Sequence, residues 1–138
     1  MVLPTLTYCG ILNLNISNTR ENKVSSFHNR AMKIIILNSK NELKIKTPVS
    51  TNQIKACQLV RKCLDGNVCS NFTNYFVKRA HHQATRNNSY QLELPKIRLE
   101  YSRGSFYYMG AKLCNDLPLQ IRKTNDYNSF NILLVDHF

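Results

Sequence analysis

The spacing of apolar residues predicts that most of this chain folds as helices. Between residues 21 and 37, apolar side chains recur every three or four positions, at Val24, Phe27, Ala31, Ile34 and Ile35. From 50 to 64 the same spacing recurs at Ile54, Cys57, Val60 and Leu64. Because this spacing places apolar side chains on one face of a helix, both stretches are expected to be amphipathic helices.

Residues that favour helix ends flank the second stretch, and shorter helices are expected downstream. Ser50 or Thr51 can cap its amino end, and Gly66 suits the left-handed turn after its carboxyl end. Further helices are expected over 71–79, before Pro118 and from about residue 129. Their predicted inward side chains are Phe72, Tyr75 and Phe76 in the first, and Phe130, Leu133, Leu134 and Phe138 in the last.

Residues 90–103 follow a different pattern. Leu92, Leu94, Ile97, Leu99 and Tyr101 are interleaved with charged residues, which indicates a strand, and Pro95 restricts it to an edge or a bulge. Residues 4–15 fit either a helix or a strand. A chain of 138 residues is long enough for one domain. The expected fold class is therefore mainly α (α+β), a small helical bundle with one extended, hairpin-like stretch around residues 90–103, in a single region over 1–138.

Basic residues greatly outnumber acidic ones. Nineteen Lys and Arg stand against eight Asp and Glu, which gives a formal net charge of +11 and predicts a polyanionic partner. The acidic residues are scattered, whereas two-metal phosphoryl transfer needs clustered carboxylates. Cys114 with His81 or His82 could supply a Cys–His nucleophile, but nothing in the sequence orients them. We therefore expect a protein that is not an enzyme, with no catalytic residue, no metal and no cofactor.

The cysteines are not spaced as zinc ligands. Cys57, Cys63 and Cys69 are separated by five residues each, rather than by two to four as in zinc sites. Six residues turn a helix by roughly 240°, so Cys57 and Cys63 would not share a face. We expect all of the cysteines to be packing residues.

No signal peptide or membrane span is expected. The first sixteen residues lack the basic start and the uninterrupted apolar run of a signal peptide, and no run is long enough for a bilayer. The chain is therefore expected inside the cell, in the nucleus or the cytoplasm, with its cysteines reduced. We expect no membrane partner and no small-molecule substrate.

Cations and aromatic residues are interleaved between residues 78 and 108. Cations neutralise phosphates, and ring faces can stack on unpaired bases. The rings are better explained as core residues, whereas the excess of cations is larger than solvation of a surface requires. This favours weak, salt-sensitive and sequence-nonspecific binding to an RNA or DNA backbone.

Five short motifs follow one another along the chain. The first two are residues 3–10 (LPTLTYCG) and 27–35 (FHNRAMKII). The third joins Pro48 and Val49 to residues 59–66 (LVRKCLDG), and the fourth is His82 with Thr85-Arg86-Asn87. The last comprises residues 105–118 (SFYYMGAKLCNDLP), Ile121-Arg122 and Ser129-Phe130. Together they resemble the carboxyl-terminal region of the reverse transcriptases of non-LTR retrotransposons (long interspersed elements).

The resemblance implies the thumb end and carboxyl-terminal extension of such an enzyme, downstream of the polymerase palm and without its active site. It implies a non-catalytic piece that helps to hold template RNA or target DNA, with the rest of the polymerase as a partner. The family usually has tryptophan where this sequence has Asn13 and Cys114. The candidate nucleic-acid-binding residues are Arg30, Lys33, Arg79, Arg86, Arg98, Arg103 and Arg122.

Of these residues, Arg30, Lys33, Arg86 and Arg122 match the family's motifs, and the other three are chosen for charge and position. Two alternatives stay open. The chain could be a helical protein-interaction module whose apolar faces pack on the rest of a polymerase. It could also be a decayed mobile-element remnant with no independent function.

Overall fold

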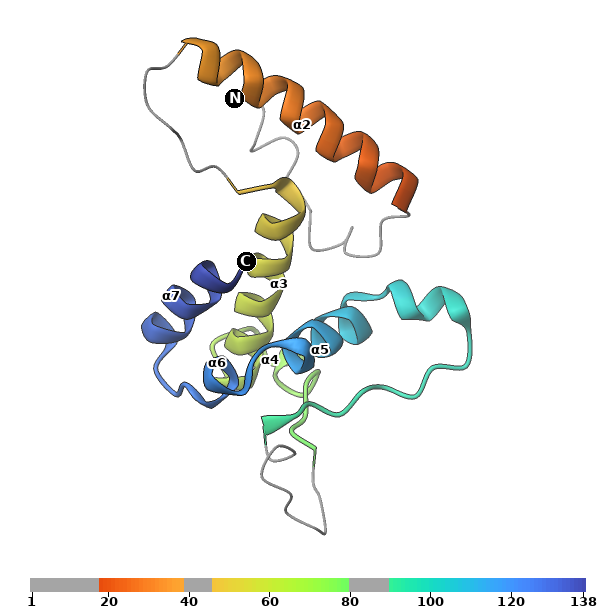
Figure 1. The fold of residues 1–138 in the computed structure, drawn as a ribbon. Helices are drawn as coiled ribbons and strands as arrows, with labels where there is room; N and C mark the ends of the chain where they lie inside the picture. The colour runs from red at the N-terminus through yellow and green to blue at the C-terminus, as the bar shows by residue number, and fades with distance from the viewer. Residues whose placement is uncertain (1–17, 39–45, 80–89) are drawn as a thin grey trace.

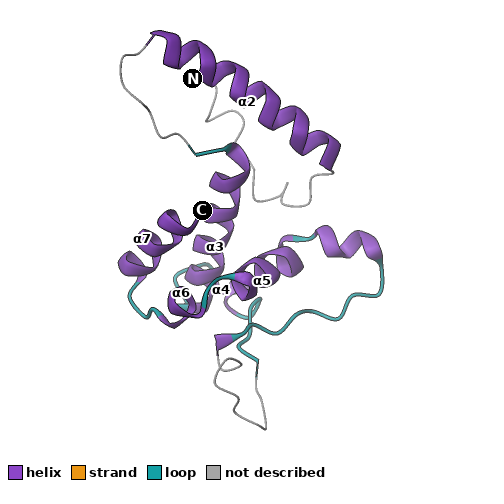
Figure 2. Ribbon diagram, viewed as in Figure 1, coloured by secondary structure: helices purple, strands orange, loops and turns teal. Residues whose placement is uncertain are grey.

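Helices dominate the computed structural model, which describes residues 18–38, 46–79 and 90–138 (Figures 1 and 2). The described elements, in chain order, are α2 (Asn18–Asn38), α3 (Pro48–Leu64), α4 (Ser70–Thr73), the 3-10 helix η3 (Glu100–Gly104), α5 (Phe106–Asp116), α6 (Leu119–Lys123) and α7 (Tyr127–His137). The mainly α class is confirmed, and the helices expected at 21–37, 50–64, before Pro118 and near the end correspond to α2, α3, α5 and α7. The predicted segment 4–15 lies outside the described residues.

Helix α3 begins earlier than the sequence suggested. Thr47 is its amino-terminal cap, and its hydroxyl accepts a hydrogen bond from the Ser50 backbone N–H at 3.2 Å. Pro48 fits the first helical position because that residue needs no N–H partner. The helix ends as expected, since Gly66 has a φ of 73°, in the left-handed region that favours glycine.

Helix α3 lies at the centre of the described fold and supplies both groups of core residues. Its Ile54 and Cys57 pack with residues of α6, α7 and the link before α6, namely Leu117, Ile121, Phe130 and Leu134. Its Val60 and Cys63 form the second group with Phe76, Leu92 and Ala111. Cys57 and Cys63 therefore lie in different groups, as their six-residue separation predicted.

Helix α5 crosses α3 closely at one point. A Cβ at Gly110 would lie 3.0 Å from the Val60 Cγ2 atom and 3.2 Å from the Phe106 ring. Glycine lets the two helix backbones approach there. Ser105 caps α5, because its hydroxyl accepts a hydrogen bond from the Tyr108 backbone N–H at 3.4 Å.

Helix α2 packs against α3 and extends beyond the rest of the bundle (Figure 1). Val24 and Ala31 are half-buried, as the predicted stripe requires. Phe27 and Ile34, in contrast, are 53% and 63% exposed, while His28 is buried. The prediction that Phe27 and Ile34 are buried was wrong. The buried face of α2 is rotated toward His28, so no other described element covers the helix at Phe27 and Ile34.

The alternating stretch at 90–103 forms no strand in the part of the chain that the structure describes (Figure 2). It makes a single antiparallel bridge, between Lys78 and Leu92, and then runs into η3. Leu99 and Tyr101 are 69% and 95% exposed. Alternation did not produce a strand here because the stretch has one short pairing partner, and Pro95 cannot donate to a ladder. Of the extended, hairpin-like stretch predicted around residues 90–103, only the bridge between Lys78 and Leu92 is present.

Leu92 is held by a side chain rather than by a neighbouring strand. The Asn115 Oδ1 atom accepts a hydrogen bond from the Leu92 N–H at 2.8 Å, and Asn115 Nδ2 donates to the Leu92 carbonyl at 3.0 Å. Both backbone groups of this buried residue are thereby satisfied.

Two other packing predictions were partly wrong. The helix expected over 71–79 is only α4, and of its predicted inward residues Phe76 is buried while Phe72 and Tyr75 are exposed. In α7, Phe130 and Leu134 are buried as predicted, but Leu133 is exposed. In both places, fewer apolar side chains of a short helix are buried in the core than the spacing predicted. Within the described residues, no helix is both long and apolar enough to cross a membrane.

Candidate nucleic-acid interface

The six described members of the predicted nucleic-acid-binding set are spread over the molecule. Arg30 and Lys33 are exposed on α2, Arg79 is exposed just after the bridge, and Arg98 and Arg103 are exposed before and within η3. Arg122 is half-buried on α6, and Arg86 lies outside the described residues. Arg30, Arg98 and Arg122 line three separate hollows of the surface. The structure therefore does not bring the described members of this set into one site.

The cations of α2 are exposed. Arg30 and Lys23 line one shallow groove, together with Ser26 and the exposed ring of Phe27. Lys33 is exposed one turn further along the helix. Lys23 was not part of the predicted site, although it lies seven residues, about two helical turns, before Arg30 and therefore on the same side of α2.

The cations near η3 have different surroundings. Arg98 lines a groove with Lys96 and Tyr107. The Arg103 Nε atom lies 3.2 Å from the Glu100 Oε2 atom, and both side chains are largely exposed. An exposed ion pair of this kind contributes little to stability, so Arg103 can exchange Glu100 for a phosphate at small cost.

Arg122 lies in a more enclosed setting than the other predicted cations. It lines a cavity of about 80 Å³ between the carboxyl-terminal half of α3, α6 and the segment around Leu92. Arg61, Lys78 and Tyr90 also line this cavity, and the sequence analysis did not group any of them with Arg122. They come from three distant segments, so no local spacing could have signalled the grouping.

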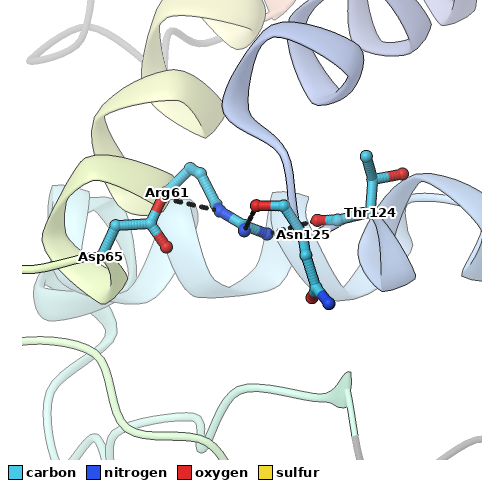
Figure 3. A network of polar contacts seen from close by, with 4 residues as sticks. All are labelled: Arg61, Asp65, Thr124 and Asn125. Carbon is cyan, nitrogen blue, oxygen red and sulfur yellow. Dashed lines mark hydrogen bonds and ion pairs between the residues drawn. The ribbon is translucent and has the colours of Figure 1, made fainter.

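Arg61, which also lines this cavity, makes an ion pair and two hydrogen bonds within the protein (Figure 3). Its Nε atom lies 2.9 Å from the Asp65 Oδ2 atom. Its Nη1 and Nη2 atoms donate hydrogen bonds to the carbonyls of Thr124 and Asn125, at 2.8 and 2.7 Å. Its guanidinium also lies 5.6 Å from the centre of the Phe130 ring. The guanidinium of Arg61 therefore has partners within the protein, whereas that of Arg122 has buried nitrogen atoms without a hydrogen bond.

The Cys63 and Cys114 thiols are unsuited to act as nucleophiles. A hydrogen bond with Cys57 and burial together raise the pKa of Cys114 well above its usual value. Burial and the nearby Cys69 raise the pKa of Cys63. A thiol with a raised pKa stays protonated at neutral pH, and the thiolate is the nucleophilic form. His81 and His82, the predicted partners of Cys114, lie outside the described residues. Among the described residues, no three His, Cys, Asp or Glu side chains converge to hold a metal ion.

Two of the aromatic rings between residues 78 and 108 pack against the buried ring of Phe76. The Phe106 ring lies edge-on to Phe76 with centroids 5.6 Å apart, and Tyr107 lies 5.8 Å from Phe76. Both belong to the periphery of the second core group, as the packing interpretation of the rings expected. Tyr90 and Tyr101 differ, since they are 38% and 95% exposed. These two rings are open to an external partner.

The chain matches no protein-family model, no curated protein and no solved structure. Its likeness to non-LTR reverse transcriptases thus depends on the five motifs alone.

Proposed function

We propose that this chain is a non-catalytic piece of a reverse transcriptase of the non-LTR retrotransposon type that binds the backbone of RNA or DNA without reading its sequence. In the cell it would act in the nucleus or the cytoplasm, where nucleic acid is accessible and cysteines stay reduced. The four described cysteines, Cys57, Cys63, Cys69 and Cys114, are free.

One observation carries the proposal: the large excess of cations is mostly not paired with acids. The net charge is +11. Within the described residues only two ion pairs form, Arg61–Asp65 and Arg103–Glu100. Exposed cations without acidic partners bind counterions, and a polyanion that displaces these ions gains affinity from their release. The cations lie on several faces, which suits backbone binding better than the reading of base edges.

The test measures binding of the full chain to labelled single- and double-stranded oligonucleotides by fluorescence anisotropy over a range of salt concentrations. We expect the logarithm of the affinity to fall linearly with the logarithm of the salt concentration. Oligonucleotides of equal length and different sequence should bind with similar affinity. Affinity that does not change with salt, or that is confined to one sequence, would contradict the proposal.

Charge-removing variants connect this binding to the predicted residues. The double variant Arg30→Gln/Lys33→Gln removes two exposed cations of α2. It should lower the salt slope by about two, because each lost phosphate contact lowers it by about one. Asp136→Asn, which removes an exposed carboxylate of α7, is the matched control and should leave binding unchanged or slightly tighter.

A second candidate function is favoured by the outer face of α7. Ile132, Leu133 and Val135 are 64%, 41% and 40% exposed on this one helix. Several large apolar side chains exposed on one helix are a signal of a protein contact site. The chain would then be a helical module that packs against another protein, such as the rest of a polymerase.

Sedimentation of the isolated chain tests this second function. A contact face without its partner should cause self-association that increases with protein concentration, and Ile132→Lys should reduce it. A monomer at all concentrations, with binding to nucleic acid intact, would leave only the first function. A chain that neither binds nucleic acid nor associates would be a remnant without independent function.

A further inference from the structure

The cavity beside Arg122 combines an apolar inner wall with a cationic opening. Cys57, Val60, Leu92 and Leu117 line it and are buried, so they close its inner end. Lys78 and Tyr90 line it and are exposed, so they lie at its opening. At roughly 10–15 Å³ for each water-sized group, a volume of about 80 Å³ accommodates a phosphate group and little more.

The lining carries a net positive charge. Three cationic side chains, Arg61, Lys78 and Arg122, face one carboxylate, Asp65, which gives a net charge of +2. Asp65 is already paired with Arg61 at 2.9 Å. The uncompensated charge of the cavity is therefore that of Lys78 and Arg122. The nearby Cys114 thiol adds no negative charge, because its pKa is raised.

Arg122 lacks an acceptor for its guanidinium. Its Nε and Nη1 atoms are buried and make no hydrogen bond to any protein atom. A guanidinium cannot lose its proton in a protein, so it cannot relieve this cost by becoming neutral. Because buried charges are normally paired, an anion beside Arg122 would compensate a charge that the fold itself leaves unpaired.

We propose that this cavity binds a phosphate monoester, such as the terminal phosphate of an RNA or DNA strand. A monoester carries about −1.5 to −2 charges at neutral pH, which matches the net charge of the lining. An internal phosphodiester carries less charge and continues into a sugar on both sides, which a cavity closed at its inner end does not admit. For a strand end, this inference depends on the proposed function and makes it more specific.

Tyr90 suits the nucleoside that would follow the phosphate. Its ring is 38% exposed at the opening, and the Lys123 Nζ atom lies 5.8 Å from the ring centre. An exposed ring next to a phosphate site can stack on the terminal base, and Lys123 can pair with the next phosphate. The phosphate group would thus enter the cavity while the strand leaves it past Tyr90.

The test compares oligonucleotides of one sequence that carry a 5′-phosphate, a 3′-phosphate or hydroxyls at both ends. Inorganic phosphate is added separately, as a competitor and in thermal unfolding of the full chain. We expect one phosphorylated end to bind about tenfold tighter than the hydroxyl form, as one additional charge-assisted hydrogen bond implies. Inorganic phosphate should remove this preference and raise the unfolding temperature.

Two variants test whether the preference for a phosphorylated end arises in the cavity. Arg122→Met should abolish the preference for a phosphorylated end while the salt-dependent binding of the hydroxyl form persists. Lys78→Gln, at an exposed residue, should reduce the preference severalfold and serves if Arg122→Met does not fold. Lys55→Met, which removes an exposed cation of α3 outside the cavity, is the matched control and should keep the preference.

The outcomes separate this inference from the proposed function. Equal affinity for all three oligonucleotides, with no response to inorganic phosphate, would overturn the cavity proposal even if salt-sensitive binding is observed. A preference that persists in both Arg122→Met and Lys78→Gln would also overturn it. Binding of inorganic phosphate that depends on Arg122, without any binding of oligonucleotides, would support the cavity as a site for small phosphate monoesters and refute the nucleic-acid function.

Discussion

The Arg61 Nη1 atom on α3 donates a hydrogen bond to the Thr124 carbonyl at 2.8 Å, although 63 residues separate the two (Figure 3). The adjacent Nη2 atom donates to the Asn125 carbonyl at 2.7 Å. Both carbonyls belong to the turn between α6 and α7, outside either helix. One guanidinium therefore fixes the place where the last helix turns back toward α3.

Replacement of Arg61 by methionine should destabilise the fold. Arg61→Met keeps an apolar stem against Phe130 but leaves two turn carbonyls without their charged donor. We expect the free energy of unfolding to fall by about 1.5–3 kcal/mol, the range for hydrogen bonds that involve a charged group. Urea unfolding followed by far-UV circular dichroism measures it. Lys55→Met, at an exposed position of the same helix, is the control, and an equal loss there would show that the turn contacts contribute nothing.

Gly110 should resist replacement by alanine even though it lies inside a helix. Alanine gains about 1 kcal/mol in helix propensity over glycine, but its Cβ would lie 3.0 Å from Val60 Cγ2. Overpacking of a core costs about 1–3 kcal/mol, so we expect a net loss of stability on Gly110→Ala.

The control for this prediction is a double-mutant cycle with Val60→Ala. That change removes the methyl group that the new Cβ would meet most closely, so Gly110→Ala should cost less stability in the Val60→Ala protein, where the Phe106 ring still lies 3.2 Å from the new Cβ. If Gly110→Ala has the same effect in both backgrounds, the contact with Val60 does not explain the glycine.

The cap of α7 should make stability depend on acid pH. The Ser129 backbone N–H donates to the Asp126 Oδ2 atom at 2.8 Å, and this bond, with that of the Ser129 hydroxyl, lowers the pKa of Asp126. A group whose pKa is lowered by folding stabilises the fold above its unfolded pKa of about 3.9, and this stabilisation is lost as the pH falls through the folded pKa.

Asp126→Asn isolates this effect, because asparagine can still cap the helix but does not titrate. Unfolding of both proteins is measured from neutral pH down to about pH 3. The variant should lose less stability than the original chain over this range. Asp136→Asn removes an exposed carboxylate elsewhere on α7, and if it behaves like Asp126→Asn the cap is not the cause.

The sequence was most informative where a helix pattern was long and its ends were marked. The spacing of Ile54, Cys57 and Val60 and the glycine at 66 predicted α3 because both signals are local. The prediction was wrong at Phe27 and Ile34, whose burial depends on which helix lies opposite. It was also wrong for 90–103, because alternation alone does not supply a neighbouring strand, and Leu92 is instead held by Asn115.

For the candidate sites, too, the sequence predicted what depends on local signals and missed what depends on packing. Charge counts predicted a polyanion partner, and a motif pointed to Arg122, but neither could reveal that Arg61 and Lys78 line the same cavity. That grouping arises only when α3, α6 and the segment around Leu92 are packed together. Nor could the sequence show that Arg61 is held by two carbonyls while Arg122 has no acceptor.

Because Arg122 has no acceptor, its removal should stabilise the fold. Arg122→Met replaces a half-buried, unpaired guanidinium by an apolar chain of similar length. Replacing buried ionic groups by apolar side chains of similar volume is often stabilising by 1–4 kcal/mol, and since Arg122 is partly exposed we expect about 1 kcal/mol. The urea midpoint should rise with an unchanged slope, which would indicate a change in stability alone. A residue whose loss increases stability while it abolishes phosphate binding is maintained for its ligand. A lower urea midpoint for Arg122→Met than for the original chain would instead mean that the fold depends on this guanidinium.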